Sequence, residues 1–183
     1  AQAREASIEA SMERIRAKAM AMHHSDELDE VLVVLWEQFD VLGIRPMSAH
    51  MTVVDIPNNK FTFRETGKYG NRSFGEQIVD IDAMDVWKEA AEQWRRSEPE
   101  TLNRLHFPKE SLPMVWQVFQ QSFSSMPVDS RITPDDYPDG IYHIAGKHPF
   151  GYIGINQIRK ATEEEEQIVI RFASEFGRAY QRF

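Results

Sequence analysis

Apolar residues near the amino end follow two different helical patterns. Between Ile8 and Met22 they recur at alternating intervals of four and three residues, which is the spacing of a coiled-coil seam. This first seam consists of Ile8, Met12, Ile15, Ala19 and Met22. From Asp26 to Leu42 the apolar stripe is much wider, as is typical of a helix buried in a core. The polar pair His23-His24 separates the two patterns, so we expect two helices.

The first seam is open to two interpretations. It can pair with the same helix of a second copy, or it can lie on the domain that follows it. We expect the first, with a homodimer interface formed by the five seam residues. Residues 1–24 would then be a coiled-coil linker, and residues 25–183 the domain proper. Because helical patterns reach both ends of the chain, we also expect it to be a piece of a longer protein.

Two hairpins are predicted from alternating or β-branched segments that flank turn residues. The first hairpin joins residues 45–55 to residues 60–66 through Pro57-Asn58-Asn59. The second joins residues 141–146 to residues 150–158. Both hairpins favour an antiparallel sheet, because short turns connect antiparallel strands.

The remaining segments predict further helices and one more strand. Helical spacing of the apolar residues indicates helices over 83–96 and 113–126, and residues 101–107 are interpreted as a strand. The last helix begins at Thr162, which forms a capping box with Glu165. We therefore expect an α+β fold: an antiparallel sheet with packed helices, plus long helices at the N- and C-terminal ends.

Composition and charge narrow the range of partners. The formal net charge of -8 works against nucleic acid and acidic lipid surfaces, which proteins approach through Lys and Arg. The chain has no cysteine, which excludes disulfides, thiolate nucleophiles and cofactors tethered through sulfur. No apolar run reaches the roughly 18 to 20 residues that a membrane span needs. We expect a cytoplasmic protein without membrane contact and without a nucleic-acid partner.

The sequence carries no strong catalytic motif. It contains no glycine-rich dinucleotide loop, no phosphate loop, no His-Glu-x-x-His and no nucleophile elbow. Its six histidines are not spaced like the ligands of a metal site. We therefore expect neither an enzyme nor a metal-binding protein.

Large aromatic side chains gather in the middle of the chain and in its later strands. Such rings often line small-molecule cavities, and they equally often fill ordinary cores. Polar groups on the predicted strands, Asn156 among them, could orient a ligand between the rings. The candidate ligand-binding residues are His50, Trp87, Trp94, Trp116, His143 and Tyr152.

Both ends of the chain resemble a known family. The segment "FGYIGINQIRKATEEEEQIVIRFASEFGRAYQRF" combines a glycine-bearing last strand, a loop and a capped helix, and it resembles the end of GAF-type sensor domains. The start, "AREASIEASMERIRAKAMAMHHSDELDEVLVVLWEQFDVLGI", is similar to versions of that family found in large bacterial signalling proteins. Such domains often occur in tandem and ahead of histidine kinases, in two-component systems. The resemblance covers the centre, roughly residues 80–140, poorly.

The resemblance implies a non-catalytic sensory or regulatory domain. Two copies would lie side by side, and a change in the domain would alter the rotation or spacing of their terminal helices. The ligand or cofactor stays open: a covalent bilin needs a cysteine, and the cyclic-nucleotide signature that starts at Asn59-Lys60-Phe61 lacks its Asp-Glu end after Phe74. The alternative function is a purely structural dimerisation or spacer module without a ligand.

Overall fold

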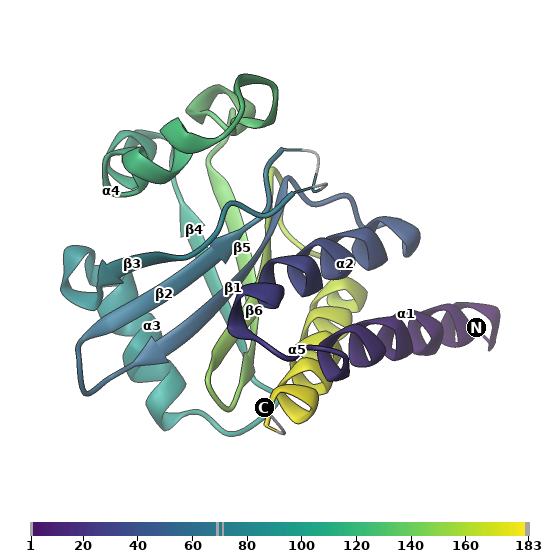
Figure 1. Cartoon of the computed structure of the whole chain (residues 1–183). Helices are drawn as coiled ribbons and strands as arrows, with labels where there is room; N and C mark the ends of the chain where they lie inside the picture. Colours follow the sequence, from purple (N-terminus) through teal and green to yellow (C-terminus); the bar gives the residue numbers. More distant parts are fainter. Residues whose placement is uncertain (1, 69, 71, 182–183) are drawn as a thin grey trace.

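Within the described residues, six strands form one antiparallel sheet in the order β3-β2-β1-β6-β5-β4 (Figure 1). The structure is a computed structural model, and it describes residues 2–68, 70 and 72–181. Both predicted hairpins are present, and they meet in the middle of the sheet because β1 pairs with β6. The strands are β1 (Ser48–Asp55), β2 (Lys60–Glu65), β3 (Gln77–Asp80), β4 (Leu102–Phe107), β5 (Ile141–His148) and β6 (Gly151–Gln157).

The short edge strand β3 is not predicted by the sequence pattern. Its residues, Gln77–Asp80, are too few to show an alternation that stands out from a loop. Backbone pairing with β2 holds it, with Val79 opposite Phe61. The tertiary structure therefore makes a strand of a segment whose own pattern gives no signal.

The helices lie close to where the sequence places them. They are α1 (Gln2–Met20), α2 (Leu28–Val41), α3 (Asp85–Arg96), α4 (Leu112–Ser125) and α5 (Glu163–Tyr180). At the start of α5, Thr162 and Glu165 form the predicted capping box. Helix α2 ends before Gly43, whose positive φ of 75° is a conformation that glycine adopts without strain. None of the described helices is long and apolar enough to cross a membrane.

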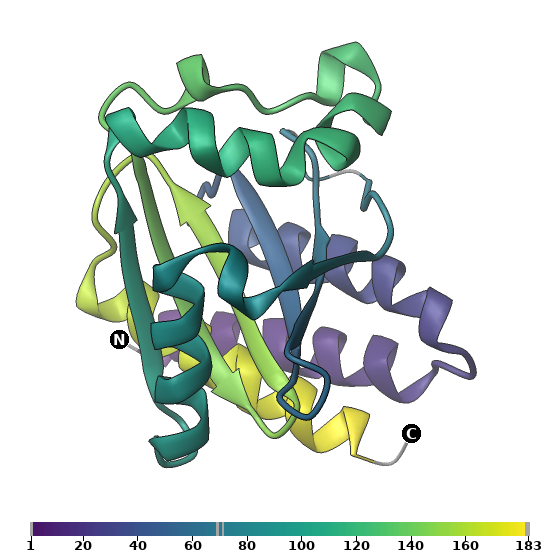
Figure 2. The ribbon, with the colours of Figure 1, turned by 90° about the vertical axis from the view of Figure 1, so that its left-hand side faces the viewer.

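The helices cover the sheet from both sides. Helices α2 and α5 lie on one face, and α3 and α4 lie on the other (Figures 1 and 2). Alternate residues of the central strands therefore enter two different cores. On β1, Ala49 and Met51 face α2 and α5, whereas Val54 belongs to the core beside α3 and α4. The expected α+β fold, with an antiparallel sheet and long terminal helices, is confirmed.

The first seam is buried inside its own chain. Helix α1 packs along α2 and α5 (Figure 1), and its five seam residues belong to the core that these helices share with the sheet. Ile15 is 0% exposed. The expectation that Ile8, Met12, Ile15, Ala19 and Met22 form a homodimer interface is therefore corrected, because α2 and α5 of the same chain already shield them from water. Residues 2–20 are part of the domain rather than a separate linker.

Two ion pairs show in which direction α1 runs relative to α5. Arg4 pairs with Glu164 near the start of α5, and Arg16 pairs with Glu175 further along it, at 2.9 and 2.7 Å. The two helices therefore run in the same direction. These pairs are partly exposed, so each is worth at most about 1 kcal/mol, and the apolar seam supplies most of the attachment.

Replacing Ile15 with Ala tests whether the seam is a core. The side chain is fully buried, so we expect the free energy of unfolding to fall by about 2–5 kcal/mol in urea titrations. Met20→Ala is the matched control on the same helix, because Met20 is 52% exposed and its truncation should change stability by less than about 0.5 kcal/mol. An Ile15→Ala protein as stable as the control would show that α1 does not rest on its own domain.

Candidate functional site

A cavity lies between the sheet and the helices α3 and α4. Its empty volume is about 840 Å³, part of which is open solvent, so this figure is an upper limit on the size of a ligand. The strands contribute polar groups, and the helices contribute mainly apolar ones. The residues from the strands include His50, Thr52, Phe63, Glu65, Asn103, Leu105, Phe107, His143, Tyr152 and Asn156; the helices and the segment after α4 add Trp87, Ala90, Val115, Trp116, Phe119, Ile132 and Tyr137.

Strand register brings the polar residues together. His50 on β1 lies opposite Glu65 on β2 and opposite Gly154 on β6. His143 on β5 lies opposite Asn156, the next residue of β6 on the same face. Because Gly154 has no side chain, nothing projects from β6 between the two histidines. Their rings stack across this strand, with centroids 4.5 Å apart and planes 17° from parallel.

His50 is buried without a hydrogen-bond partner. It is 4% exposed, and both of its ring nitrogens lack a partner among the described residues. Burial lowers the pKa of its imidazole well below 6.5, and the neighbouring His143 lowers it further. A neutral imidazole has one N–H donor and one acceptor nitrogen, and the described residues satisfy neither of them. Leaving such groups unpaired costs about 1–3 kcal/mol, and a bound ligand would recover that energy.

A hydrogen-bond network joins the other polar groups. Ser48 donates to Glu65 Oε1 at 2.6 Å, and Asn156 Nδ2 donates to the same oxygen at 3.1 Å. A carboxylate only accepts hydrogen bonds, so the amide nitrogen of Asn156 must face Glu65 and its Oδ1 must face His143. That oxygen therefore accepts a hydrogen bond from His143 Nδ1 at 3.0 Å. The Tyr137 hydroxyl lies close to Ser48 and lines the same cavity.

Burial sets the protonation preferences of this network. It raises the pKa of the Glu65 carboxyl against the opposing effect of the hydrogen bonds from Ser48 and Asn156. It lowers the pKa of His143 to about 4, although the hydrogen bond to Asn156 acts in the other direction. Burial also raises the pKa of the Tyr137 and Tyr152 hydroxyls. At neutral pH the histidines are neutral, and Glu65 is the one acidic side chain among the described residues of the lining.

Aromatic rings form the opposite side of the cavity. Phe63 of β2, Trp87 of α3 and Phe119 of α4 meet one another with centroids 5.4 to 5.7 Å apart. Trp116 donates its indole N–H to the Ile132 carbonyl, and the Tyr152 hydroxyl donates to the Ala90 carbonyl. These two polar groups are therefore satisfied within the fold, and their rings present apolar surface to the cavity.

Five of the six candidate ligand-binding residues lie together. His50, Trp87, Trp116, His143 and Tyr152 all line the cavity, and Asn156 lies with them.

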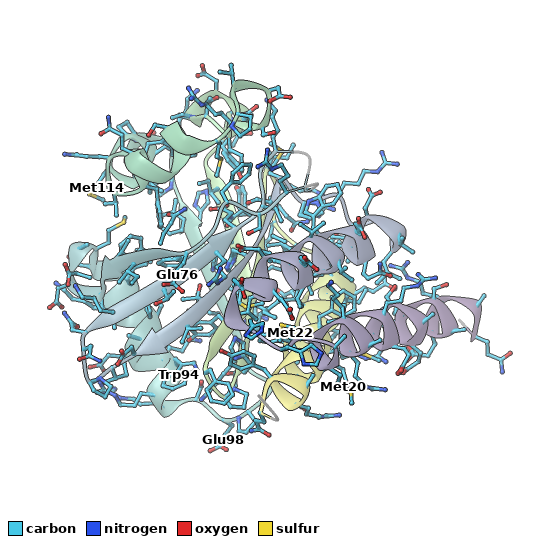
Figure 3. All side chains as sticks on the ribbon, viewed as in Figure 1. Met20, Met22, Glu76, Trp94, Glu98 and Met114 are labelled. Atoms are coloured by element: carbon cyan, nitrogen blue, oxygen red, sulfur yellow. The ribbon has the colours of Figure 1, made fainter. Side chains whose placement is uncertain are left out.

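Trp94 lies elsewhere. Its indole N–H donates to the His148 carbonyl and its ring lies near the Lys147 ammonium. Figure 3 shows it near Glu98, at the opposite end of the molecule from Met114 on α4. Trp94 follows Trp87 by two turns of the same helix, and it lines a separate pocket together with Lys147 and His148.

Glu65 is the important residue that the sequence analysis did not single out. Its signal was present in the segment "KFTFRE", where Phe61, Phe63 and Glu65 alternate and must share one face of the strand. Ser48 and Tyr137 gave no comparable signal, because their contacts depend on strands and loops far apart in the sequence.

The cavity does not form a metal centre. Among the described residues, no group of three or more His, Asp or Glu is arranged to hold a metal ion. The stacked rings of His50 and His143 lie face to face, so their nitrogens do not converge on one point.

No protein-family model matches this sequence, and no curated protein sequence is significantly similar to it.

Neutral buried histidines should make the domain acid-sensitive. The unfolded chain binds a proton at each histidine below pH 6.5, whereas folded His143 binds one only below about 4. The free energy of unfolding should therefore be highest above pH 6.5 and decrease as the pH is lowered from 6.5 to 4. In urea titrations at pH 7.5 and 4.5, His143→Gln should reduce the pH-dependent loss by about 2 kcal/mol. His24→Gln, at an exposed position, should leave it unchanged; equal losses in both variants would contradict the assignment.

Proposed function

We propose that the chain is a non-catalytic sensory domain of the GAF type, which binds a small organic molecule in the cavity between its sheet and the helices α3 and α4. The observation that carries this proposal is His50, which is buried without a hydrogen-bond partner in the wall of an aromatic cavity. Buried polar groups are usually hydrogen-bonded, and among the described residues with unpaired buried side-chain atoms His50 is the one that lines this cavity. The antiparallel sheet and the long terminal helices agree with the fold that the resemblance implies.

The strands under the cavity give a route by which a ligand could affect the terminal helices. Strands β5 and β6 line the cavity on one face and carry α5 on the other. Gly146 seats α5 closely on β5, since a Cβ at that position would lie 2.8 Å from Ala173 Cβ. A displacement of β5 would therefore reach α5 directly, and α1 through the seam and the ion pairs between α1 and α5.

The domain would act in the cytoplasm, within a bacterial signalling protein whose output domain lies elsewhere in the chain. A homodimer, which the resemblance implies, would have to use surfaces other than the buried seam or displace α1 from its own domain. Light scattering of the purified protein measures the mass that decides this point.

The variant His50→Leu separates a ligand-binding domain from a structural spacer. Leucine has a similar volume and no polar atoms, so the variant should unfold at a higher urea concentration, with a gain of about 1–3 kcal/mol. The same variant should lose the thermal shift that a panel of small neutral, cationic and anionic aromatic compounds produces in the wild type. Glu37→Gln, at an exposed position of α2 on the other face of the sheet, is the control that should keep the shift. If no compound of the panel shifts the wild-type melting temperature, the domain is a structural module.

A further inference from the structure

The unfilled hydrogen-bonding capacity of the cavity is mostly acceptor capacity. Glu65 Oε1 receives two hydrogen bonds, whereas Oε2 has no hydrogen-bond partner among the described residues. His143 donates through Nδ1, so its Nε2 is an acceptor in the neutral ring. His50 offers one acceptor nitrogen and one N–H. At Glu65, His143 and His50, three free acceptors therefore face a single free donor, and a ligand that complements these three residues should carry N–H or O–H groups.

The charges of the residues that line the cavity also favour a ligand that carries N–H groups. Glu65 is the acidic residue of the cavity, and no Lys or Arg lines the cavity among the described residues. An anionic ligand would meet a carboxylate and no compensating cation in a poorly hydrated space, which is unfavourable. A cationic ligand would instead pair with Glu65. The histidines do not oppose it, because burial keeps both of them neutral at pH 7.

The aromatic wall provides a place for the rest of such a ligand. Phe63, Trp87 and Phe119 form a continuous surface beside Glu65, and Phe63 precedes Glu65 by two residues on the same face of β2. Rings of this kind attract cations through their faces and bury apolar groups. A molecule with an ammonium group and a flat apolar body therefore matches both sides of the cavity.

We propose that the cavity selects small organic amines, with the ammonium group bound at Glu65, His50 and His143 and the apolar body against Phe63, Trp87 and Phe119. This inference rests on the proposed ligand-binding function and specifies the chemical class of the ligand. It distinguishes the cavity from sites for phosphates, cyclic nucleotides or carboxylic acids, all of which bring negative charge.

Three probes that differ only in their head group test the inference: 2-phenylethylamine, 2-phenylethanol and 3-phenylpropionate. They place a cation, a neutral hydroxyl and an anion on the same ring and two-carbon chain. Titrations followed by NMR or calorimetry at pH 7 should show the amine binding at least about tenfold more tightly than the alcohol. The carboxylate should show no saturable binding. Trp87 and Trp116 line the cavity, so the fluorescence change on amine binding should diminish in Trp87→Phe.

The variant Glu65→Gln identifies the source of the preference. It should bring the affinities of amine and alcohol to within about twofold of each other, since it removes the charge and keeps a polar group of the same size. Glu37→Gln is the matched control: Glu37 is an exposed residue of α2, on the other face of the sheet, and it controls for general attraction of cations by a protein of net charge -8. This control should leave the preference intact.

Several outcomes would overturn the inference while leaving the ligand-binding function standing. These are equal affinities of the wild type for amine and alcohol, tighter binding of the carboxylate, or an amine preference that survives Glu65→Gln. Binding of none of the three probes would also overturn it. The ligand-binding function itself fails only if the broader panel of compounds leaves the melting temperature unchanged. The wild-type comparison needs no variant, so it stands even if Glu65→Gln does not fold.

Discussion

The domain depends on three adjacent strands, β1, β6 and β5, that are covered on both faces. Each of them directs alternate side chains into the core shared with α2 and α5 and into the cavity beneath α3 and α4. A slip of one residue would exchange the two sets. It would place Met51 and Ile155 in the cavity wall, and it would bury His50 and Asn156 against α2 and α5. The apolar core therefore fixes the register, and the register in turn assembles the polar site.

The polar site is costly for the folded domain. His50 is buried with both ring nitrogens unpaired, and Glu65 is half-buried without a cationic partner among the described residues of the cavity lining. Replacing such groups with apolar residues usually stabilises a core. His50 and Glu65 lie side by side in the wall of one cavity, which is the pattern expected where stability has been exchanged for recognition.

The position of α1 changes how such a domain could communicate with its surroundings. A coiled-coil seam is usually imagined between two chains, yet here the seam joins α1 to α2 and α5 of its own chain. Helices α1 and α5 run in the same direction and are tied by ion pairs along their length. The two terminal helices therefore form one unit with the back of the sheet. Motion of β5 and β6 would be passed to both ends of the domain together.

The sequence by itself determined the elements and, through them, the class of fold. Helical and alternating periods located the helices and both hairpins, and the Thr162–Glu165 capping box was readable because capping is a local interaction. Five cavity residues were also anticipated, since aromatic and histidine side chains on predicted strands and helices are conspicuous. The tertiary structure alone decided three matters: the partner of the α1 seam, the existence of β3, and the contact of Glu65 with Ser48 and Asn156. A four-and-three spacing reports only that a helix has a narrow apolar face, and not which chain covers it. The other two depend on pairings between distant segments, which no local pattern records.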